Sequence, residues 1–449
     1  MRLDTMMHDT QKTGTQLWKK AKRIIPGGTQ LLSKRSEQFL PDYWPSYYSR
    51  AKGVEVWGID DKKFVDMSIM GVGACPLGYA DDDVDTAVKA AIDKGSMCTL
   101  NCPEDVELAE KLISLHPWAE MVRYARGGGD SMTVAVRIAR AHTKRDKIAF
   151  CGYHGWHDWY LAANLADDRN LDGHLLPGLD PTGVPRGLLG TSIPFRYNHP
   201  EEIEAIADHT TGDLAAIVME PIRDHNPEPE FLKTIHRITH ETGAILVIDE
   251  VSAGFRLNTG GAHKLYGIKP DIAVFAKAIS NGYPMGAIIG KSEVMESAQD
   301  TFISSTYWTE RLGPVAACTT IEKYERCNVP DHLIKTGTAV QAIWSKAADS
   351  SGISIEAGGI PPLSHFTVAG TSPDETQQIF TLYTQLMLDR GFLAGKSFYS
   401  SYSHTKAHLD SFQIAVEESF GIISGAIENK TVKKMLKGSV AQTGFKRLT

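Results

Sequence analysis

The sequence predicts an α/β fold in which helices cover both faces of a mostly parallel β-sheet. Between about residues 71 and 320, short apolar runs alternate with amphipathic, helix-like segments. Four of the runs are expected to be strands, at 147–151, 214–219, 244–248 and 271–276. Alternation of this kind is typical of parallel sheets, whose strands are buried on both faces and are therefore apolar throughout.

The length of the chain predicts more than one domain. Its 449 residues exceed a single ordinary core, and a content of 42% hydrophobic and 22% charged residues is typical of globular proteins. We expect a large domain at 71–320 and a smaller α+β domain at 321–449, to which an N-terminal segment, 1–70, contributes. The smaller domain should hold helices at 331–349, 376–389 and 409–428, and a hairpin at 54–66 should complete it.

Charge and composition exclude several functions. A net charge of -7 argues against nucleic-acid binding, because a phosphate backbone favours a basic surface. No apolar stretch is long enough to span a membrane, and the N-terminus lacks the apolar core of a signal peptide. The six cysteines form no C-x-x-C pair and the 16 histidines no H-E-x-x-H run. We therefore expect reduced thiols, a cytoplasmic location and no metal centre.

Two charged residues follow buried strands in a pattern that points to chemistry. Asp249 ends the run that begins at Ala244, and Lys277 follows the next run, 28 residues later. An amine and a carboxylate at one sheet edge are the two groups that a pyridoxal 5′-phosphate (PLP) enzyme needs. The amine forms a Schiff base with the aldehyde, and the carboxylate keeps the pyridine nitrogen protonated. Each residue taken alone is more often a solvated strand end.

The same edge should hold further site residues, because ligands of parallel sheets bind beyond the carboxyl ends of the strands. Glu220 follows the strand at 214–219 directly. The run Gly127–Gly129 precedes a helix at 131–141, and backbone N–H groups at a helix N-terminus favour an anion such as a phosphate. A plain tight turn explains the three glycines equally well.

Two loops are open to more than one interpretation. Tyr153-His154-Gly155 follows the strand at 147–151, and its aromatic ring could stack on a cofactor or simply pack. A metal site from His154 and His157 is disfavoured, since no third ligand is evident. The hydroxyls of the loop 304–314 could serve a phosphate or cap the following helix.

Together these segments resemble class III aminotransferases of PLP fold type I, in the glutamate-1-semialdehyde aminomutase-like branch. The resemblance covers roughly residues 20–425 and includes 122–141, Tyr153-His154-Gly155, Glu220-Pro221, Asp249-Glu250-Val251 and Gly254-Phe255-Arg256 in family order. It implies a homodimer with shared active sites and PLP as the cofactor. The implied site residues are Lys277, Asp249 and Glu220 as catalytic residues, and Gly128, Gly129, Tyr153, His154, Val251 and Thr306 as further cofactor-binding residues.

The resemblance also implies individual roles. Lys277 would carry PLP and move the proton between the substrate and the cofactor, and Asp249 would pair with the pyridinium. Tyr153 and Val251 would enclose the ring. Gly128 and Gly129 would bind phosphate, and Thr306 would reach the phosphate of the neighbouring subunit.

Three departures from the family bear on the activity. Gly127–Gly129 stands where the family has Ser-Gly-Thr, Leu31–Arg35 replaces a Ser-Pro-Val-Arg segment, and Phe398–Ser400 stands about where a glutamate is expected. The last two shape the substrate pocket of the aminomutase. The sequence thus favours a transaminase that moves an amino group from a donor amino acid to an aldehyde or ketone acceptor.

Two alternatives stay open: a 2,1-aminomutase and a non-catalytic binding protein on the same fold. Lys34, Arg35 and Arg126 are candidates for binding an acidic substrate group, although solvated surface positions are the more common fate of such cations.

Overall fold

The computed structural model describes residues 13–174, 177–222 and 224–445. It divides into two compact units. The larger unit consists of residues 73–77 and 81–334, and the smaller unit contains the described parts of 1–72 and 335–449 together with 78–80. The domain limits at residues 70 and 320 stay predictions.

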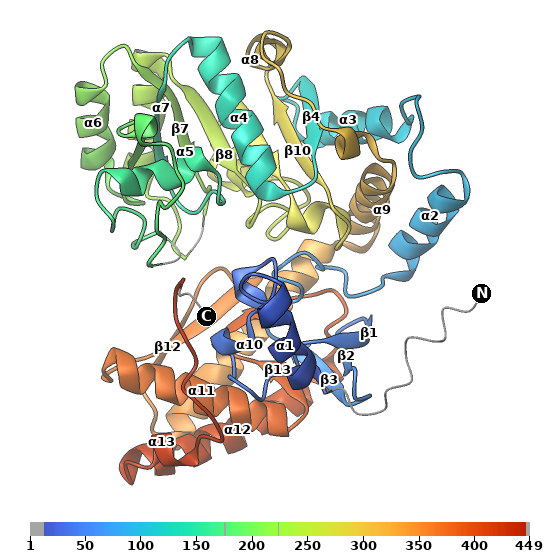
Figure 1. Ribbon diagram of the computed structural model, residues 1–449, viewed down its shortest axis with the longest axis vertical. Helices are drawn as coiled ribbons and strands as arrows, with labels where there is room; N and C mark the ends of the chain where they lie inside the picture. Colours follow the sequence, from blue (N-terminus) through green and yellow to red (C-terminus); the bar gives the residue numbers. More distant parts are fainter. Residues whose placement is uncertain (1–12, 175–176, 223, 446–449) are drawn as a thin grey trace. The chain divides into compact units, whose positions relative to one another are not determined.

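The larger unit is built on a seven-stranded sheet with the order β4-β10-β9-β8-β7-β5-β6 (Figure 1). The five strands from β9 to β6 run parallel to one another, whereas β10 is antiparallel to both of its neighbours. The strands are β4 (Met121–Ala125), β5 (Lys147–Cys151), β6 (Ser192–Pro194), β7 (Leu214–Met219), β8 (Ile245–Asp249), β9 (Ile272–Phe275) and β10 (Gly286–Gly290). The predicted α/β class with a mostly parallel sheet is confirmed.

The central strands are apolar because both of their faces are covered. Every residue of β7, β8, β9 and β10 is buried. Helix α4 (Gly128–Thr143) packs across the sheet and buries Met132, Ala135 and Ile138 in the same core as Val218 and Val247 (Figure 1). Continuous burial of this kind removes the alternation that marks a half-exposed strand.

Short helices and turns connect the strands of the larger unit. Its other helices are α2 (Asp82–Asp93), α3 (Glu104–Leu115), α5 (Asp158–Leu161), α6 (Pro200–His209), α7 (Pro229–Thr242), α8 (Ser292–Met295) and α9 (Leu312–Cys327). Helix α7 shows how the sequence sets their limits. Pro229 occupies the first turn, where its missing N–H costs no hydrogen bond, and Gly243 ends the helix with φ +66°.

The smaller unit has two sheets. Strands β1 (Tyr48–Lys52), β2 (Glu55–Gly58) and β3 (Lys63–Met67) form the first with β13 (Phe392–Ala394), which is parallel to β3. The predicted hairpin is the β2–β3 pair. The second sheet contains β11 (Ile355–Gly358), β12 (Leu363–Val368) and β14 (Ser397–Tyr399).

The helices of this part of the chain are α1 (Gly14–Ile24), α10 (Val329–Ser351), α11 (Pro373–Asp389), α12 (Lys406–Glu428) and α13 (Val432–Met435). The core includes a cluster of aromatic residues, in which Phe366 contacts Trp344, Tyr383 and Phe420. Within the described residues, none of the helices combines the length and the apolar character needed to cross a membrane.

Candidate active site

Three predicted site residues follow adjacent parallel strands at one edge of the larger sheet. Glu220 comes directly after β7, Asp249 is the last residue of β8, and Lys277 follows β9 by two residues. Strands β7, β8 and β9 are consecutive neighbours, and Asp249 is in register with Val274 of β9. The structure therefore gathers these residues at the carboxyl ends of the strands, as predicted.

Asp249 is a buried carboxylate with two protein donors. It is 3% exposed, and its Oδ1 accepts a hydrogen bond from the Val251 backbone N–H at 2.9 Å. Its Oδ2 lies 2.7 Å from Nδ1 of His154, which is itself buried. A buried carboxylate of this kind is costly unless cations or donors surround it. The protonated nitrogen of a pyridine ring suits the acceptor capacity that Asp249 retains.

The hydrogen bonds of His154 fix the orientation of its ring. Nε2 is 3.0 Å from the carbonyl oxygen of Cys151, which only accepts, so Nε2 carries a proton. Nδ1 faces the Asp249 carboxylate, so that contact also requires a proton between the two groups. The imidazole ring is thereby held between the Cys151 carbonyl and the Asp249 carboxylate. The sequence placed His154 near the cofactor but did not identify Asp249 as its partner.

Lys277 is held in a strained backbone conformation. Its φ is +49°, a left-handed value that is uncommon for residues other than glycine and is concentrated at functional sites. The half-buried side chain donates a hydrogen bond from Nζ to Oγ of Ser252 at 2.9 Å. Ser252 lies three residues after Asp249, so one loop contacts both groups. This role of Ser252 was missed, although its place in the loop after β8 was visible in the sequence.

The glycine run forms the entrance to α4. Gly127 precedes the first turn, and no side chain caps the helix there. A Cβ on Gly128 would lie 2.8 Å from Cγ1 of Val251, closer than packing allows. This 16-residue helix begins with two glycines, so no side chain covers their backbone N–H groups, and Gly128 lies beside Val251. This is a suitable cradle for a phosphate.

Tyr153 and Glu220 are joined through the backbone. The Tyr153 N–H donates to Oε2 of Glu220 at 3.3 Å. Gly152 has φ +111°, and a Cβ there would lie 2.5 Å from the same oxygen. The Tyr153 ring packs edge-on against Tyr160, with centroids 5.7 Å apart. Buried Glu220 thus fixes the backbone that carries the predicted stacking ring.

The loop after Tyr153 packs on the phosphate cradle. Gly155 has φ +110°, and a Cβ there would lie 2.9 Å from the Cα of Gly129. His157 Nε2 lies 3.1 Å from Asp130 Oδ1 in the first turn of α4. His154 and His157 therefore contact different carboxylates.

Thr306 and Arg126 both take part in hydrogen bonds of the loop that precedes α9. Thr306 begins the short 3₁₀ helix η9 (Thr306–Thr309) and is exposed. Arg126 is not the solvated surface cation that is usual for such residues: its side chain is 11% exposed and pairs with Glu310 at 2.7 Å. Its donors are engaged within the protein, so Arg126 is a poor candidate for binding an acidic substrate group.

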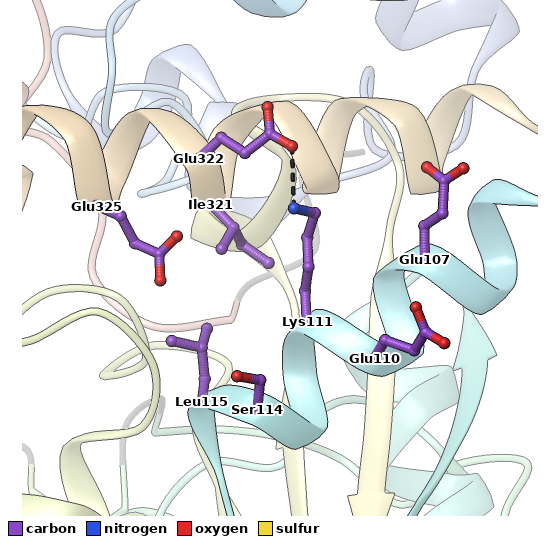
Figure 2. Close-up of a pocket in the computed structure, with 8 residues that line it drawn as sticks. All are labelled: Glu107, Glu110, Lys111, Ser114, Leu115, Ile321, Glu322 and Glu325. Atoms are coloured by element: carbon purple, nitrogen blue, oxygen red, sulfur yellow. Dashed lines mark ion pairs between the residues drawn. The ribbon is translucent and has the colours of Figure 1, made fainter.

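A polar cleft in the larger unit contains none of the predicted site residues. It lies between α3 and α9 and has a volume of about 510 Å³ (Figure 2). Its walls carry four glutamates and Lys111, whose Nζ pairs with Glu322 at 2.9 Å. The chemistry expected of Lys277 and Asp249 therefore belongs elsewhere, at the strand ends.

The residues present fit PLP. The buried carboxylate of Asp249 suits a ring nitrogen, the Lys277 amine suits an aldehyde, and the uncapped glycines at the start of α4 suit a phosphate. The contact expected of Thr306, with the phosphate of a neighbouring subunit, stays a prediction.

Comparison with known proteins identifies the family of the chain. Residues 41–355 match the family model of class-III aminotransferases. The chain is 32% identical to a 3-aminobutyryl-CoA aminotransferase of Cloacimonas acidaminovorans, over 94% of this chain and 97% of that protein. It is 31% identical to a glutamate-1-semialdehyde 2,1-aminomutase of Heliobacterium modesticaldum, over 91% and 97%.

Solved structures share the fold. An omega-transaminase from Sphaerobacter thermophilus superposes with a TM-score of 0.81 at 22% identity, covering 91% of this chain and 97% of that one. The fold, the enzyme class and the family expected from the sequence are confirmed. The chain belongs to the class-III aminotransferases.

Proposed function

We propose that this aminotransferase uses PLP to move an amino group from a donor amino acid to an aldehyde or ketone acceptor, with Lys277 as the catalytic amine. The observation that carries the proposal is the convergence of Lys277 and the buried Asp249–His154 pair on adjacent strand ends. When bound, PLP supplies the electron sink that lets the substrate Cα–H bond break.

The protein's own groups divide the remaining work. Asp249 would accept a hydrogen bond from the ring nitrogen and keep it protonated, and His154 holds that carboxylate in place. The Nζ of Lys277 would take the proton from the substrate Cα and pass it to C4′ of the cofactor. Tyr153 and Val251 would enclose the ring, and Gly128 and Gly129 would offer backbone N–H groups to the phosphate.

A covalent trapping experiment tests the amine. Borohydride treatment of the PLP-loaded protein should abolish its visible absorbance and leave a PLP-sized mass on the peptide that contains Lys277. Lys277→Ala should abolish turnover while some PLP stays bound. Lys291→Ala is a matched control, because Lys291 pairs with Asp271 at 2.7 Å, near the opposite end of β9. Normal turnover by Lys277→Ala would make the proposal wrong.

A half-reaction separates the transaminase from the aminomutase. The alternative has specific support in the 31% identity to the Heliobacterium aminomutase. A transaminase should release a keto acid from a donor amino acid and convert the bound cofactor to its amine form. An aminomutase should instead turn over its substrate without an external donor. A non-catalytic protein should do neither. Amino donors can be screened by the spectral shift of the bound cofactor, and in that case none of them should produce a shift.

We also propose that the chain acts as a homodimer through exposed apolar side chains of the larger unit. Leu100 is 79% exposed, Phe302 86% and Tyr307 72%. Their two loops are joined, since the Arg311 N–H donates to the Ser96 carbonyl at 2.9 Å. Large exposed apolar groups that lie close together commonly mark a protein interface.

Light scattering after size exclusion tests the dimer. Phe302→Lys should yield a monomer at concentrations where the wild type is dimeric. Ile414→Lys is the control, because Ile414 is 60% exposed on α12 of the smaller unit. A dimer in both variants would place the interface elsewhere.

A cytoplasmic location is proposed on the basis of cysteine usage. Within the described residues none of the six cysteines forms a disulfide, and cysteines that stay reduced are typical of reducing compartments. Thiol titration of the denatured protein, purified without reductant, should count all of them. A lower count would indicate disulfides and a different compartment.

A further inference from the structure

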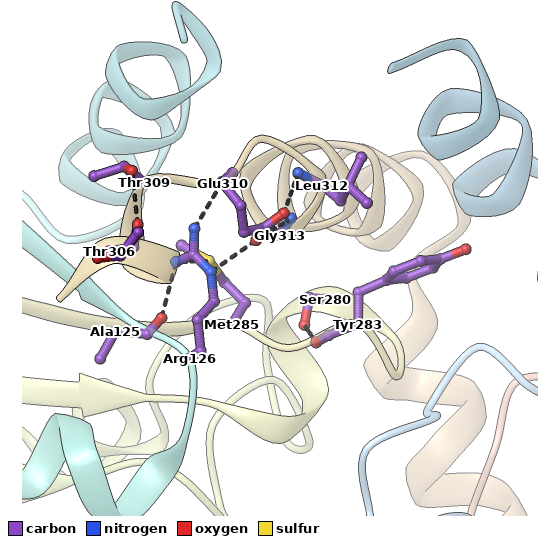
Figure 3. A network of polar contacts seen from close by, with 10 residues as sticks. All are labelled: Ala125, Arg126, Ser280, Tyr283, Met285, Thr306, Thr309, Glu310, Leu312 and Gly313. Carbon is purple, nitrogen blue, oxygen red and sulfur yellow. Dashed lines mark hydrogen bonds and ion pairs between the residues drawn. The ribbon is translucent and has the colours of Figure 1, made fainter. Parts of the chain in front are cut away.

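Arg126 is the last residue before the glycine run, and its side chain reaches across to the loop before α9 (Figure 3). Its Nε donates to Oε1 of Glu310 at 2.7 Å, and its Nη2 donates to the Glu310 backbone carbonyl at 2.7 Å. Its Nη1 donates to the carbonyl of Ala125, the last residue of β4, at 3.0 Å. All three guanidinium nitrogens are therefore engaged, and the side chain is 11% exposed.

Glu310 is fixed from its other side by α9. Its Oε2 accepts from the backbone N–H of Leu312 at 2.6 Å, and its Oε1 accepts from that of Gly313 at 3.0 Å. A Cβ on Gly313 would lie 2.8 Å from Oε1, so glycine leaves the room that this contact needs. The helix N-terminus and Arg126 thus both stabilise the negative charge of Glu310.

The glycine run needs such external anchors because it has no side chains. After the run, Oγ of Ser131 in α4 donates to the Gly127 carbonyl at 2.9 Å. Before the run, Arg126 fixes the chain where it leaves β4. Glycine gains much conformational freedom when it is not held, and a loose loop binds an anion less well than a rigid one.

We propose that the Arg126–Glu310 ion pair is a positioning pair that preorganises Gly127–Gly129 for the cofactor phosphate, an inference that rests on the proposed function. The backbone N–H groups of the run bind the phosphate, and Arg126 acts only through the loop that it anchors. Removal of the pair weakens phosphate recognition and leaves recognition of the pyridine ring unchanged, because Asp249 and Lys277 lie on other strands.

A second ion pair in the same loop provides a matched control. Arg311 contacts Glu104 of α3 through Nε and Nη2 at 2.6 to 3.0 Å, with side chains that are 18% and 17% exposed. It is the next residue after Glu310 and similarly shielded, but it does not contact the entrance to α4. A merely structural role for Arg126 predicts that Arg126→Lys and Arg311→Lys behave alike.

The experiment measures dissociation constants of the full-length apoprotein by visible absorbance. The ligands are PLP and pyridoxal, which has the same ring and aldehyde but no phosphate. The variants are Arg126→Lys, Glu310→Gln, the double variant and Arg311→Lys. Competition by inorganic phosphate and thermal melting of each apoprotein complete the set.

Arg126→Lys should weaken PLP binding roughly tenfold, since lysine lacks the planar fork that contacts Glu310 twice. Binding of pyridoxal should stay within about twofold, and inorganic phosphate should compete less well. The double variant should be no weaker than Arg126→Lys, because the two residues act as one unit. Arg311→Lys should keep the wild-type ratio of the two affinities.

Equal weakening of PLP and pyridoxal, or an unchanged affinity for PLP in Arg126→Lys, would overturn the inference. So would an Arg311→Lys variant with the same loss of PLP affinity. Failure of the proposed function is distinguishable, because the wild type itself would then show no PLP absorbance that depends on Lys277.

Discussion

His154 Nδ1 lies 2.7 Å from Asp249 Oδ2, and both side chains are almost fully shielded from solvent. The carbonyl of Cys151 holds the second ring nitrogen of His154, so the imidazole has no freedom to turn away. The Asp249 carboxylate is therefore held in a fixed position at the end of β8. Its geometry leads to the first prediction.

Asp249→Asn should lower the rate of the amino-donor half-reaction by about 100-fold or more, in the range seen when one preorganised electrostatic group is removed. The amide is neutral, so it no longer favours a protonated ring nitrogen. Stopped-flow absorbance with a donor amino acid measures the rate. Asp271→Asn, which removes a carboxylate near the start of β9, should react at nearly the normal rate. A half-reaction of Asp249→Asn within a factor of three of wild type would remove Asp249 from its role.

Gly128→Ala should weaken PLP binding, because the added Cβ would lie 2.8 Å from Cγ1 of Val251 and would displace one wall of the ring pocket. Gly425→Ala is the matched control, since nothing lies within 4 Å of a Cβ there and alanine is the better helix former in α12. Titration of each apoprotein with PLP gives the affinities, and thermal melting gives the stabilities. We expect the first variant to lose affinity and the second to gain a little stability; equal PLP affinities would contradict the packing argument.

His116 should make the stability of the protein depend on pH. Burial lowers the pKa of His116 to about 3, and the ring is neutral, with Nδ1 donating to the Leu112 carbonyl and Nε2 accepting from the Gly261 N–H. The unfolded chain binds a proton near pH 6.5 and the folded chain does not. The contribution of His116 to stability is therefore fully present above about pH 6.5 and is lost as the pH falls toward 3.

The loss should approach about 1.4 kcal/mol per pH unit below the unfolded pKa. Urea unfolding at pH 7.5, 6.0 and 5.0 measures it. His116→Gln keeps a donor and an acceptor but does not titrate, so its stability should fall less steeply with acid. Parallel pH profiles for the two proteins would show that His116 is not the titrating group.

Local pattern was enough to predict the strands and the residues that follow them. Continuous apolar runs marked β7, β8 and β9, and the rule for parallel sheets brought Glu220, Asp249 and Lys277 to one edge. The direction of β10 and its place between β4 and β9 were not predictable, because strand pairing joins segments far apart in the chain.

The same limit applies to the side chains of the site. His154 and Asp249 are 95 residues apart, and Arg126 and Glu310 are 184 apart. Nothing in either local segment indicates such a partner, so each charge appeared as a possible surface group. Only the fold shows that Arg126 is held by Glu310 and that Ser252 contacts Lys277.

The antiparallel course of β10 sets the range of movement of Lys277. A parallel neighbour would have required a long crossover after β9, whereas here the chain reverses within 276–285 and rejoins the same sheet. The lysine is thus tethered on both sides to the same sheet, by β9 before it and β10 after it. Its amine can travel only as far as its own four methylene groups allow, and a short, reproducible reach of this kind suits the role proposed for Lys277, in which the amine leaves a carbon atom, moves a proton close by and then returns to the same carbon.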